Sequence, residues 1–314
     1  MTDTLPVIDM TSDDATLATA IGNAARSVGF FYVTGHGIDP ALLAAVFAGS
    51  AKFFALPATV KERQSIRLSP HNRGYVGIKG ESLDPTKAPD LKEAYNIGLD
   101  LAADDPRVVR GEPFRGLNLW PDLPGWRETM LAYFDAVWSV GRRLHAGIAR
   151  DLDLDPAYFE DKLDEPMATL RLLHYPPQPM AAAAGQIGAG EHTDYGDITL
   201  LLTDEVGGLE VKRRDGGWIA APHVPGAFIC NIGDCLMRWT NDIYVSTPHR
   251  VVNRSGRERY SVAFFLDPNP DAEVACLPTC VSPGRPARYP AVTGADYLTA
   301  RLNATYSFRQ PAQT

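Results

Sequence analysis

The sequence predicts a mainly β core that follows a largely helical N-terminal part. In the second half of the chain, short segments rich in Val, Ile, Leu, Phe and Tyr alternate with Gly, Pro, Asp and Asn turns, which is typical of a sandwich, a jelly roll or a barrel. Helical periodicity dominates the first half instead. The 27 glycines and 25 prolines among 314 residues exceed the usual share of these residues and predict many turns.

The composition is that of a globular protein without a basic surface. With 45% hydrophobic and 22% charged residues, the chain can bury a full core, which excludes intrinsic disorder. The 30 basic and 38 acidic residues give a net charge of −8, which argues against nucleic acid and anionic membranes as partners. The acidic N-terminus does not resemble a secretory signal, and no stretch approaches the ~20 apolar residues of a membrane span, so we expect a cytoplasmic protein. The four cysteines have spacings unlike a disulfide framework or most zinc sites and are interpreted as buried thiols: Cys230, Cys235, Cys276 and Cys280.

The N-terminal part begins with two helices and a strand between them. Residues 11–14 form an N-cap pattern for a helix whose apolar residues recur at helical spacing until Gly29. Residues 30–33 are interpreted as a short buried strand. Asp39 and Pro40 then predict the start of a second helix that runs to Phe54.

The longest helical pattern precedes the β segments. Residues 57–122 show no sustained period and are interpreted as loops with short helices and strands. Residues 126–152 carry apolar side chains at 3.6-residue spacing, and one short helix is expected after Asp155 and Pro156. A last helix is expected over residues 294–306. Between them lie the strand candidates, at residues 167–175, 198–203, 209–212, 218–221, 227–231, 249–253 and 260–267.

Three residues in the β region form a candidate metal site. His192 and Asp194 are two positions apart in an extended segment, so both side chains project from one face. That spacing alone is weak evidence, because an exposed turn also explains it, and a third ligand is required. His249 supplies one, with 54 residues between it and Asp194. Two imidazoles and one carboxylate leave coordination positions open, the arrangement of non-haem Fe(II) oxygenases.

Nearly the whole chain resembles the Fe(II)/2-oxoglutarate-dependent dioxygenase superfamily, in the branch that includes isopenicillin N synthase. The resemblance is carried by several segments that together and in this order are highly specific, and the five from residue 170 onward are the stronger matches. They are residues 5–9, 29–33, 35–38, 118–121, 170–177, 192–196, 231–234, 246–253 and 259–261.

The resemblance implies a fold, a metal and a reaction. The family fold is a double-stranded β-helix, or jelly roll, buttressed by helices, which agrees with the helices and short strands expected above. His192, Asp194 and His249 would bind Fe(II). O2 and 2-oxoglutarate would be consumed, and oxidative decarboxylation of 2-oxoglutarate would drive hydroxylation or a related oxidation of a small organic substrate.

The resemblance also implies residues for the co-substrate. Arg259 and Ser261 match the family's R-x-S pair, which grips the distal carboxylate of 2-oxoglutarate, and a guanidinium fork suits a carboxylate. Tyr175 matches a tyrosine that contacts the co-substrate. Leu173 stands where several relatives carry an asparagine that also touches it, so one polar contact is missing here.

One oxygenase domain is expected over residues 1–314, and we expect a monomer. Its mostly helical part would cover residues 1–165, the jelly-roll core with the metal site residues 166–285, and the C-terminal helix residues 286–314. Two alternatives stay open: an Fe(II) oxidase of the isopenicillin N synthase type that does not use 2-oxoglutarate, and a non-catalytic jelly roll that binds a metal or ligand.

Several other polar residues are expected to have structural roles. His174 should point away from Tyr175 on the strand, His36 should form local hydrogen bonds, and Arg250 should form a salt bridge. Substrate choice is expected to depend on residues 65–115 and 177–190 and on the C-terminal helix, which either buttresses the core or covers the mouth of the site.

Overall fold

Two antiparallel-rich sheets lie face to face in the computed structural model, which describes residues 4–81, 90–177, 188–253 and 255–305. Apolar side chains from both sheets form one cluster between them, so the arrangement is that of the expected jelly roll. The larger sheet consists, in order, of β1 (Val7–Asp9), β2 (Phe30–Thr34), β10 (Phe228–Ile232), β7 (Ile198–Thr203), β12 (Arg259–Leu266), β5 (Thr169–Tyr175), β4 (Glu93–Gly98) and β3 (Gly74–Val76). The smaller sheet consists of β6 (Ala189–His192), β11 (His249–Val251), β8 (Leu209–Lys212) and β9 (Trp218–Ala221).

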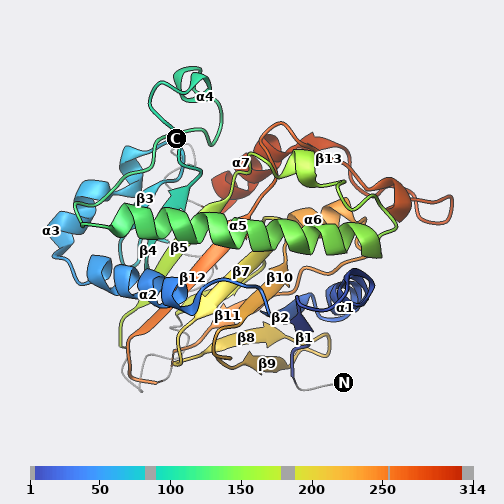
Figure 1. Ribbon diagram of the computed structural model, residues 1–314, viewed down its shortest axis with the longest axis horizontal. Helices are drawn as coiled ribbons and strands as arrows, with labels where there is room; N and C mark the ends of the chain where they lie inside the picture. The colour runs from blue at the N-terminus through green and yellow to red at the C-terminus, as the bar shows by residue number, and fades with distance from the viewer. Residues whose placement is uncertain (1–3, 82–89, 178–187, 254, 306–314) are drawn as a thin grey trace, which may run out of the picture.

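Long helices cover the outer face of the larger sheet (Figure 1). The helix α5 (Trp126–Asp151) runs across it, with α1 (Asp14–Ser27) and α2 (Pro40–Phe54) packed against α5. The larger hydrophobic cluster lies between these helices and the sheet. Because side chains alternate along a strand, the other face of the same strands is free to line the space between the sheets.

Shorter elements complete the described chain. Short α-helices are α3 (Ala58–Lys61), α4 (Pro106–Val109) and α6 (Asp234–Trp239), and α7 (Gly294–Thr305) lies near the C-terminus. A two-stranded sheet pairs β13 (Glu273–Val274) with β14 (Val292–Thr293). The 3₁₀ turns are Glu62–Gln64, Ile66–Leu68, Glu160–Lys162 and Pro278–Cys280.

The sequence signals for the helices are confirmed at their starts. The Asp13 carboxylate accepts hydrogen bonds from the first backbone amides of α1, and the Asp39 carboxylate accepts one from Ala41 N at 2.8 Å. Both carboxylates satisfy amides that have no partner within the helix. The helix expected after Pro156 is a 3₁₀ turn, and Tyr306 of the expected last helix lies outside the described residues.

The irregular region contains the strand β4, where the sequence predicted short strands without placing them. Every residue of β4 is buried, although it contains Glu93 and Asn96. Glu93 is held there by Lys61 Nζ at 2.6 Å and His174 Nδ1 at 2.8 Å. Glu93 and Asn96 interrupt the apolar pattern by which a buried strand is recognised in a sequence, so the bounds of β4 could not be predicted.

The single helices of the described chain differ in length or hydropathy from a membrane-spanning helix. Taken singly, none of them is both long and apolar enough to cross a bilayer. The pair formed by α2 and residues 58–64, bent by 108°, passes only when the two are counted together, by length and composition alone.

Candidate active site

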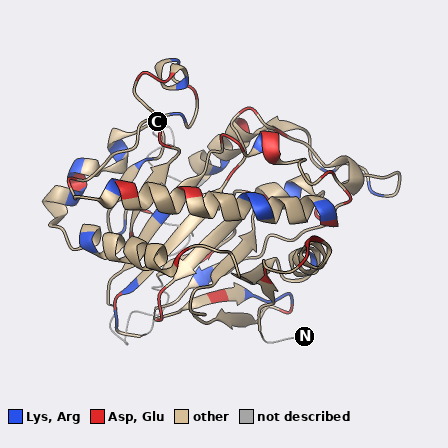
Figure 2. Ribbon diagram, viewed as in Figure 1, with Lys and Arg blue, Asp and Glu red and all other residues tan. Residues whose placement is uncertain are grey.

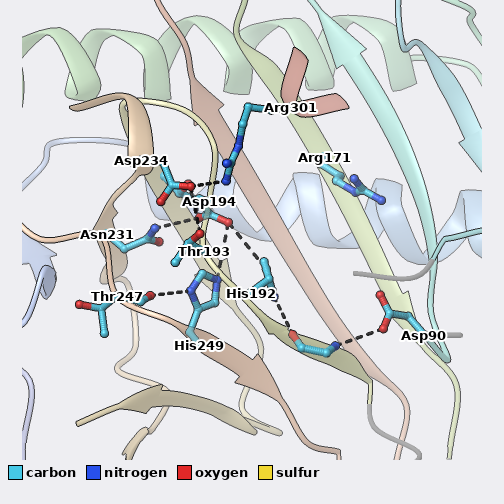
Figure 3. Close-up of polar contacts among 12 residues, drawn as sticks. Asp90, Arg171, His192, Thr193, Asp194, Asn231, Asp234, Thr247, His249 and Arg301 are labelled. Atoms are coloured by element: carbon cyan, nitrogen blue, oxygen red, sulfur yellow. Dashed lines mark hydrogen bonds and ion pairs between the residues drawn. The ribbon is translucent and has the colours of Figure 1, made fainter. Parts of the chain in front are cut away.

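Three side chains converge between the two sheets. His192 ends β6 and His249 begins β11, and the two residues are paired across these antiparallel strands. Asp194 follows two residues after His192, and its Oδ1 lies 3.7 Å from His192 Nε2 and 3.6 Å from His249 Nε2. Figure 3 shows the three side chains pointing toward one another. One ligand atom from each lies within 4.8 Å of the other two, close enough to share one cation.

Backbone carbonyls fix the orientation of both imidazoles. His192 Nδ1 lies 2.6 Å from Gly190 O, and His249 Nδ1 lies 3.2 Å from Thr247 O. A carbonyl oxygen only accepts, so each Nδ1 carries the hydrogen and each Nε2 keeps a lone pair aimed at Asp194. Burial and the neighbouring His249 ring lower the pKa of His192, which favours the neutral, metal-binding form.

The Asp194 carboxylate is oriented by two donors from neighbouring strands. Thr199 Oγ1 donates to Asp194 Oδ2 at 2.6 Å, and Asn231 Nδ2 donates to the same oxygen at 2.8 Å. Thr199 and Asn231 are cross-strand partners in the β7–β10 ladder, which explains why both reach one oxygen. Burial raises the pKa of Asp194, but the positive charge of the imidazoles when they are protonated and these two donors outweigh that effect and hold the pKa below its usual value. Oδ1 is thus left for a cation.

A buried carboxylate supports His192 through the backbone. Asp90 Oδ1 accepts a hydrogen bond from Gly190 N at 3.1 Å, and Gly190 O contacts His192. Asp90 Oδ2 pairs with Lys92 Nζ at 2.7 Å, and Lys92 lies 3.3 Å from Glu81 Oε2. Figure 3 shows the connection from Asp90 to His192.

The C-terminal helix α7 is tied to the turn that carries Asp194. Thr193 Oγ1 donates to Asp234 Oδ2 at 3.0 Å, and the Arg301 guanidinium forms an ion pair with the same Asp234 oxygen. Arg301 also lies over the Tyr195 ring, 4.7 Å from its centroid. The helix therefore contacts both the ligand turn and the cavity.

The predicted co-substrate residues lie together at one end of the β5–β12 ladder. Arg259 pairs with Tyr175 across the strands, and its guanidinium carbon lies 4.6 Å from the Tyr175 ring centroid. Arg259 is 0% exposed. Its Nε donates to Gly207 O at 2.6 Å and its Nη1 to Ser261 Oγ at 3.1 Å, whereas Nη2 has no hydrogen-bond partner in the described part of the chain. No carboxylate of the described residues pairs with it, so this cation fits an added carboxylate.

A single cavity of about 160 Å³ contains both groups of residues. Its polar lining includes the three converging residues, the Arg259 group and a further set of buried and half-buried side chains from β4, β5 and the loops that flank β3 and β4. That further set is Asn72, Arg73, Glu81, Lys92, Asn96, Thr169 and Arg171, and Phe114 with Leu298 and Leu302 of α7 adds apolar surface.

The structure confirms the structural roles expected for three polar residues. His174 faces away from Tyr175 and stacks on Tyr260, with ring centroids 4.7 Å apart. His36 accepts from Ile38 N at 3.1 Å through Nδ1 and contacts a backbone carbonyl through Nε2. Arg250 pairs with the Glu210 carboxylate at 2.6 Å.

Sequence reasoning gave no specific role to four residues of this site. Thr199 and Asn231 orient Asp194, Asp90 supports His192, and Arg73 lines the cavity. Weak signals existed, because Asp90 and Arg73 lie within residues 65–115, on which substrate choice was expected to depend, and Asn231 belongs to one of the segments that carry the resemblance.

Comparison with known proteins gives matches over most of the chain. The family model described as non-haem dioxygenase in morphine synthesis N-terminal matches residues 5–123, and the model of the 2OG-Fe(II) oxygenase superfamily matches residues 166–268. The 2-oxoglutarate-Fe(II) type oxidoreductase hxnY of Emericella nidulans is 40% identical over 88% of this chain and 81% of its own.

Solved structures also match this chain over most of its length. A full-length protein of Neurospora crassa, crystallised in complex with alpha-KG, superposes with a TM-score of 0.85 at 35% identity over 96% of both chains. JOX2, crystallised with 2OG, Fe and JA, gives a TM-score of 0.80 at 30% identity over 95% of this chain and 84% of its own. These matches confirm the fold expected from the resemblance.

Proposed function

Because the chain belongs to the 2OG-Fe(II) oxygenase superfamily, we propose that His192, Asp194 and His249 are the ligands of its Fe(II). The protein is an Fe(II)/2-oxoglutarate-dependent dioxygenase, which couples oxidative decarboxylation of 2-oxoglutarate by O2 to oxidation of a small organic substrate. The distances among the three side chains and the two Nε2 lone pairs support the ligand assignment.

Arg259, Ser261 and Tyr175 are our candidates for the 2-oxoglutarate site. The observation that carries this assignment is the Arg259 guanidinium, which is fully buried and has an Nη2 without a partner in the described chain. A buried cation is strongly disfavoured unless an anion compensates it. Ser261 adds a hydroxyl beside the guanidinium, and the Tyr175 ring packs against its face.

Each residue would contribute to the reaction without carrying out the redox step. When bound, Fe(II) supplies the redox chemistry that joins O2, 2-oxoglutarate and substrate. The His192 and His249 rings and Asp194 Oδ1 would hold the metal, and a set of only three protein ligands would leave coordination positions for the reactants. Arg259 orients the co-substrate through its distal carboxylate, and the buried cavity keeps water from the reacting groups.

The test is succinate release from 2-oxoglutarate by the full chain reconstituted with Fe(II). The wild-type protein should release succinate in an iron-dependent way, and His249→Ala should abolish that release because one of the three ligands is removed. His36→Ala is the matched control, since His36 is also buried but hydrogen-bonds only backbone groups and does not line the cavity.

Two results would contradict the proposal. Full iron-dependent activity in His249→Ala would remove the ligand assignment. Iron-dependent oxidation that proceeds without 2-oxoglutarate would favour the isopenicillin N synthase type of reaction instead.

The monomeric state, the cytoplasmic location and the absence of nucleic acid and membrane partners remain predictions. The net charge of −8 supports the exclusion of nucleic acid. Figure 2 agrees with this, because Lys and Arg are interspersed with Asp and Glu along the elements in view. Light scattering of the purified protein would test the oligomeric state.

A further inference from the structure

A second buried arginine lines the same cavity. Arg73 is 1% exposed, and its Nη2 reaches only Phe114 O, at 3.4 Å. Its Nε has no hydrogen-bond partner among the described residues, and no described carboxylate forms an ion pair with it. Burial and the nearby Arg115 lower the pKa of Arg73 to about 10, so the group is still charged at neutral pH.

The other cations at this end of the cavity have anionic partners. Arg171 Nη2 lies 2.6 Å from Glu81 Oε2, and Lys92 Nζ lies 2.7 Å from Asp90 Oδ2 and 3.3 Å from Glu81 Oε2. The Glu81 and Asp90 carboxylates thus form ion pairs with Arg171 and Lys92. Arg73 adds a positive charge that no carboxylate of the described chain pairs with.

The backbone is shaped to place the Arg73 guanidinium. A Cβ at Gly98 would lie 1.9 Å from the Arg73 Cζ and Nη2 atoms, so any side chain at this position would displace the guanidinium. Asn72, which precedes Arg73, has φ 63°, and Phe114, whose carbonyl contacts it, has φ 60°. Left-handed backbone is unfavourable for a bulky residue such as phenylalanine and is concentrated at ligand-binding sites.

Arg73 is separate from the co-substrate residues. The Arg73 guanidinium lies against Gly98, which pairs with Thr169 at the start of β5, whereas Arg259 pairs with Tyr175 at its end. Six residues of extended strand separate these two positions by about 20 Å at a rise of roughly 3.3 Å per residue. One molecule of 2-oxoglutarate cannot engage both arginines.

We propose that Arg73 binds a carboxylate of the primary substrate, which makes that substrate a small organic acid. The inference rests on the proposed function, because it takes the Arg259 end of the cavity as the 2-oxoglutarate site and gives the Arg73 end to the substrate. A guanidinium binds a carboxylate through short, charge-assisted hydrogen bonds, often two in parallel. Asn72 and Asn96 also line this end, and each has a buried Oδ1 without a partner in the described chain. They would accept hydrogen bonds from an N–H or O–H next to the substrate carboxylate.

The test measures binding of small carboxylates against their neutral amides. Acetate, benzoate and pyrrole-2-carboxylate, each with its matching carboxamide, are titrated calorimetrically into anaerobic protein loaded with Fe(II) and saturating 2-oxoglutarate. Saturation keeps Arg259 engaged with the co-substrate. At least one carboxylate should bind about tenfold or more tightly than its amide, and pyrrole-2-carboxylate, with an N–H beside its carboxylate, should bind most tightly.

Variants of Arg73 then identify the group responsible. Arg73→Met should abolish the preference for the carboxylate, and Arg73→Lys should keep part of it, because a charge remains without the fork geometry. Arg115→Met is the matched control, since Arg115 is buried nearby but does not line the cavity; it should change the preference by less than about threefold. If Arg73→Met does not fold, Arg73→Gln serves in its place.

Two results would overturn the inference: no carboxylate preferred over its amide by the wild-type protein, or a preference that persists in Arg73→Met. Affinity for 2-oxoglutarate is measured anaerobically with the same preparations, and their iron-dependent succinate release is measured after air is admitted. Their persistence in a wild-type protein that shows no carboxylate preference would refute only the substrate class, whereas their loss in the wild-type protein would refute the proposed function.

Discussion

Replacing Thr199 with valine should weaken Fe(II) binding while leaving all three proposed ligands in place. The Thr199 hydroxyl donates at 2.6 Å to Asp194 Oδ2, the oxygen that faces away from the imidazoles. Valine has nearly the same shape as threonine but no donor, so the carboxylate loses one of its two hydrogen bonds. Asp194 would then be free to rotate, and Oδ1 would meet the metal less often.

The structure sets the size of this effect. A hydrogen bond to a charged group contributes about 1.5–3 kcal/mol, which corresponds to roughly a 10- to 150-fold change in an equilibrium constant. Asn231 still donates to the same oxygen at 2.8 Å, so the lower end of the range applies. We therefore expect the Fe(II) dissociation constant to rise about 10- to 30-fold, within the range usual for groups that orient metal ligands.

Anaerobic calorimetric titration with Fe(II), in the presence of 2-oxoglutarate, measures this change directly. Thr203→Val is a matched control, because Thr203 lies on the same strand, is equally buried at 4% exposure, and contacts His223 rather than Asp194. Its Fe(II) affinity should stay within about twofold of wild type. Equal affinities in Thr199→Val, Thr203→Val and the wild-type protein would show that the hydroxyl does not orient the carboxylate and would refute the reasoning.

Two further predictions concern other buried charges. Arg259→Met should raise the KM for 2-oxoglutarate about a hundredfold, since truncating a buried charge partner typically costs 2–5 kcal/mol. The KM of Arg259→Lys should lie between that of Arg259→Met and that of the wild-type protein. An unchanged KM in succinate assays would remove the assignment of Arg259 to the co-substrate. Burial raises the pKa of Glu93, but hydrogen bonds from His174 and Lys61 outweigh it, so the pKa lies below 4.5. The stabilisation from Glu93 is thus complete above about pH 4.5 and is lost as the pH falls through its lower folded-state value. Glu93→Gln should therefore lower Tm at neutral pH yet flatten the acid-side fall in Tm, and thermal scans in which both proteins keep the same acid slope would contradict this linkage.

The sequence predicted the elements that depend on residues close together in the chain, such as helix caps and short apolar strands. The caps at Asp13 and Asp39 and the short apolar segment at residues 198–203 each depend on neighbours within a few positions, and the structure has them where expected. The period of two also explains why Arg259 and Ser261 meet, with Nη1 and Oγ 3.1 Å apart.

What the patterns missed depends on partners distant in the chain. Short strands were expected within residues 57–122, but the position of β4 was not predicted, because Glu93 and Asn96 interrupt its apolar character. Both residues are buried where β4 pairs with β5. In the same way, Thr199 and Asn231 orient Asp194 only because the β7–β10 register sets them opposite each other. No spacing along the sequence encodes that register.

The charged and apolar parts of the cavity lining are not equally free to change during evolution. Asp90 pairs with Lys92 and also holds the Gly190 backbone that orients His192, so a change at either charged residue would alter the proposed iron site as well as the cavity. Burying one partner of an ion pair without the other is strongly destabilising, which further restricts these positions. Phe114, by contrast, contributes apolar surface to the cavity, and its side chain has no such connection to the ligands among the described contacts. Substrate range in this enzyme should therefore diverge first at the apolar wall, with the charged network retained.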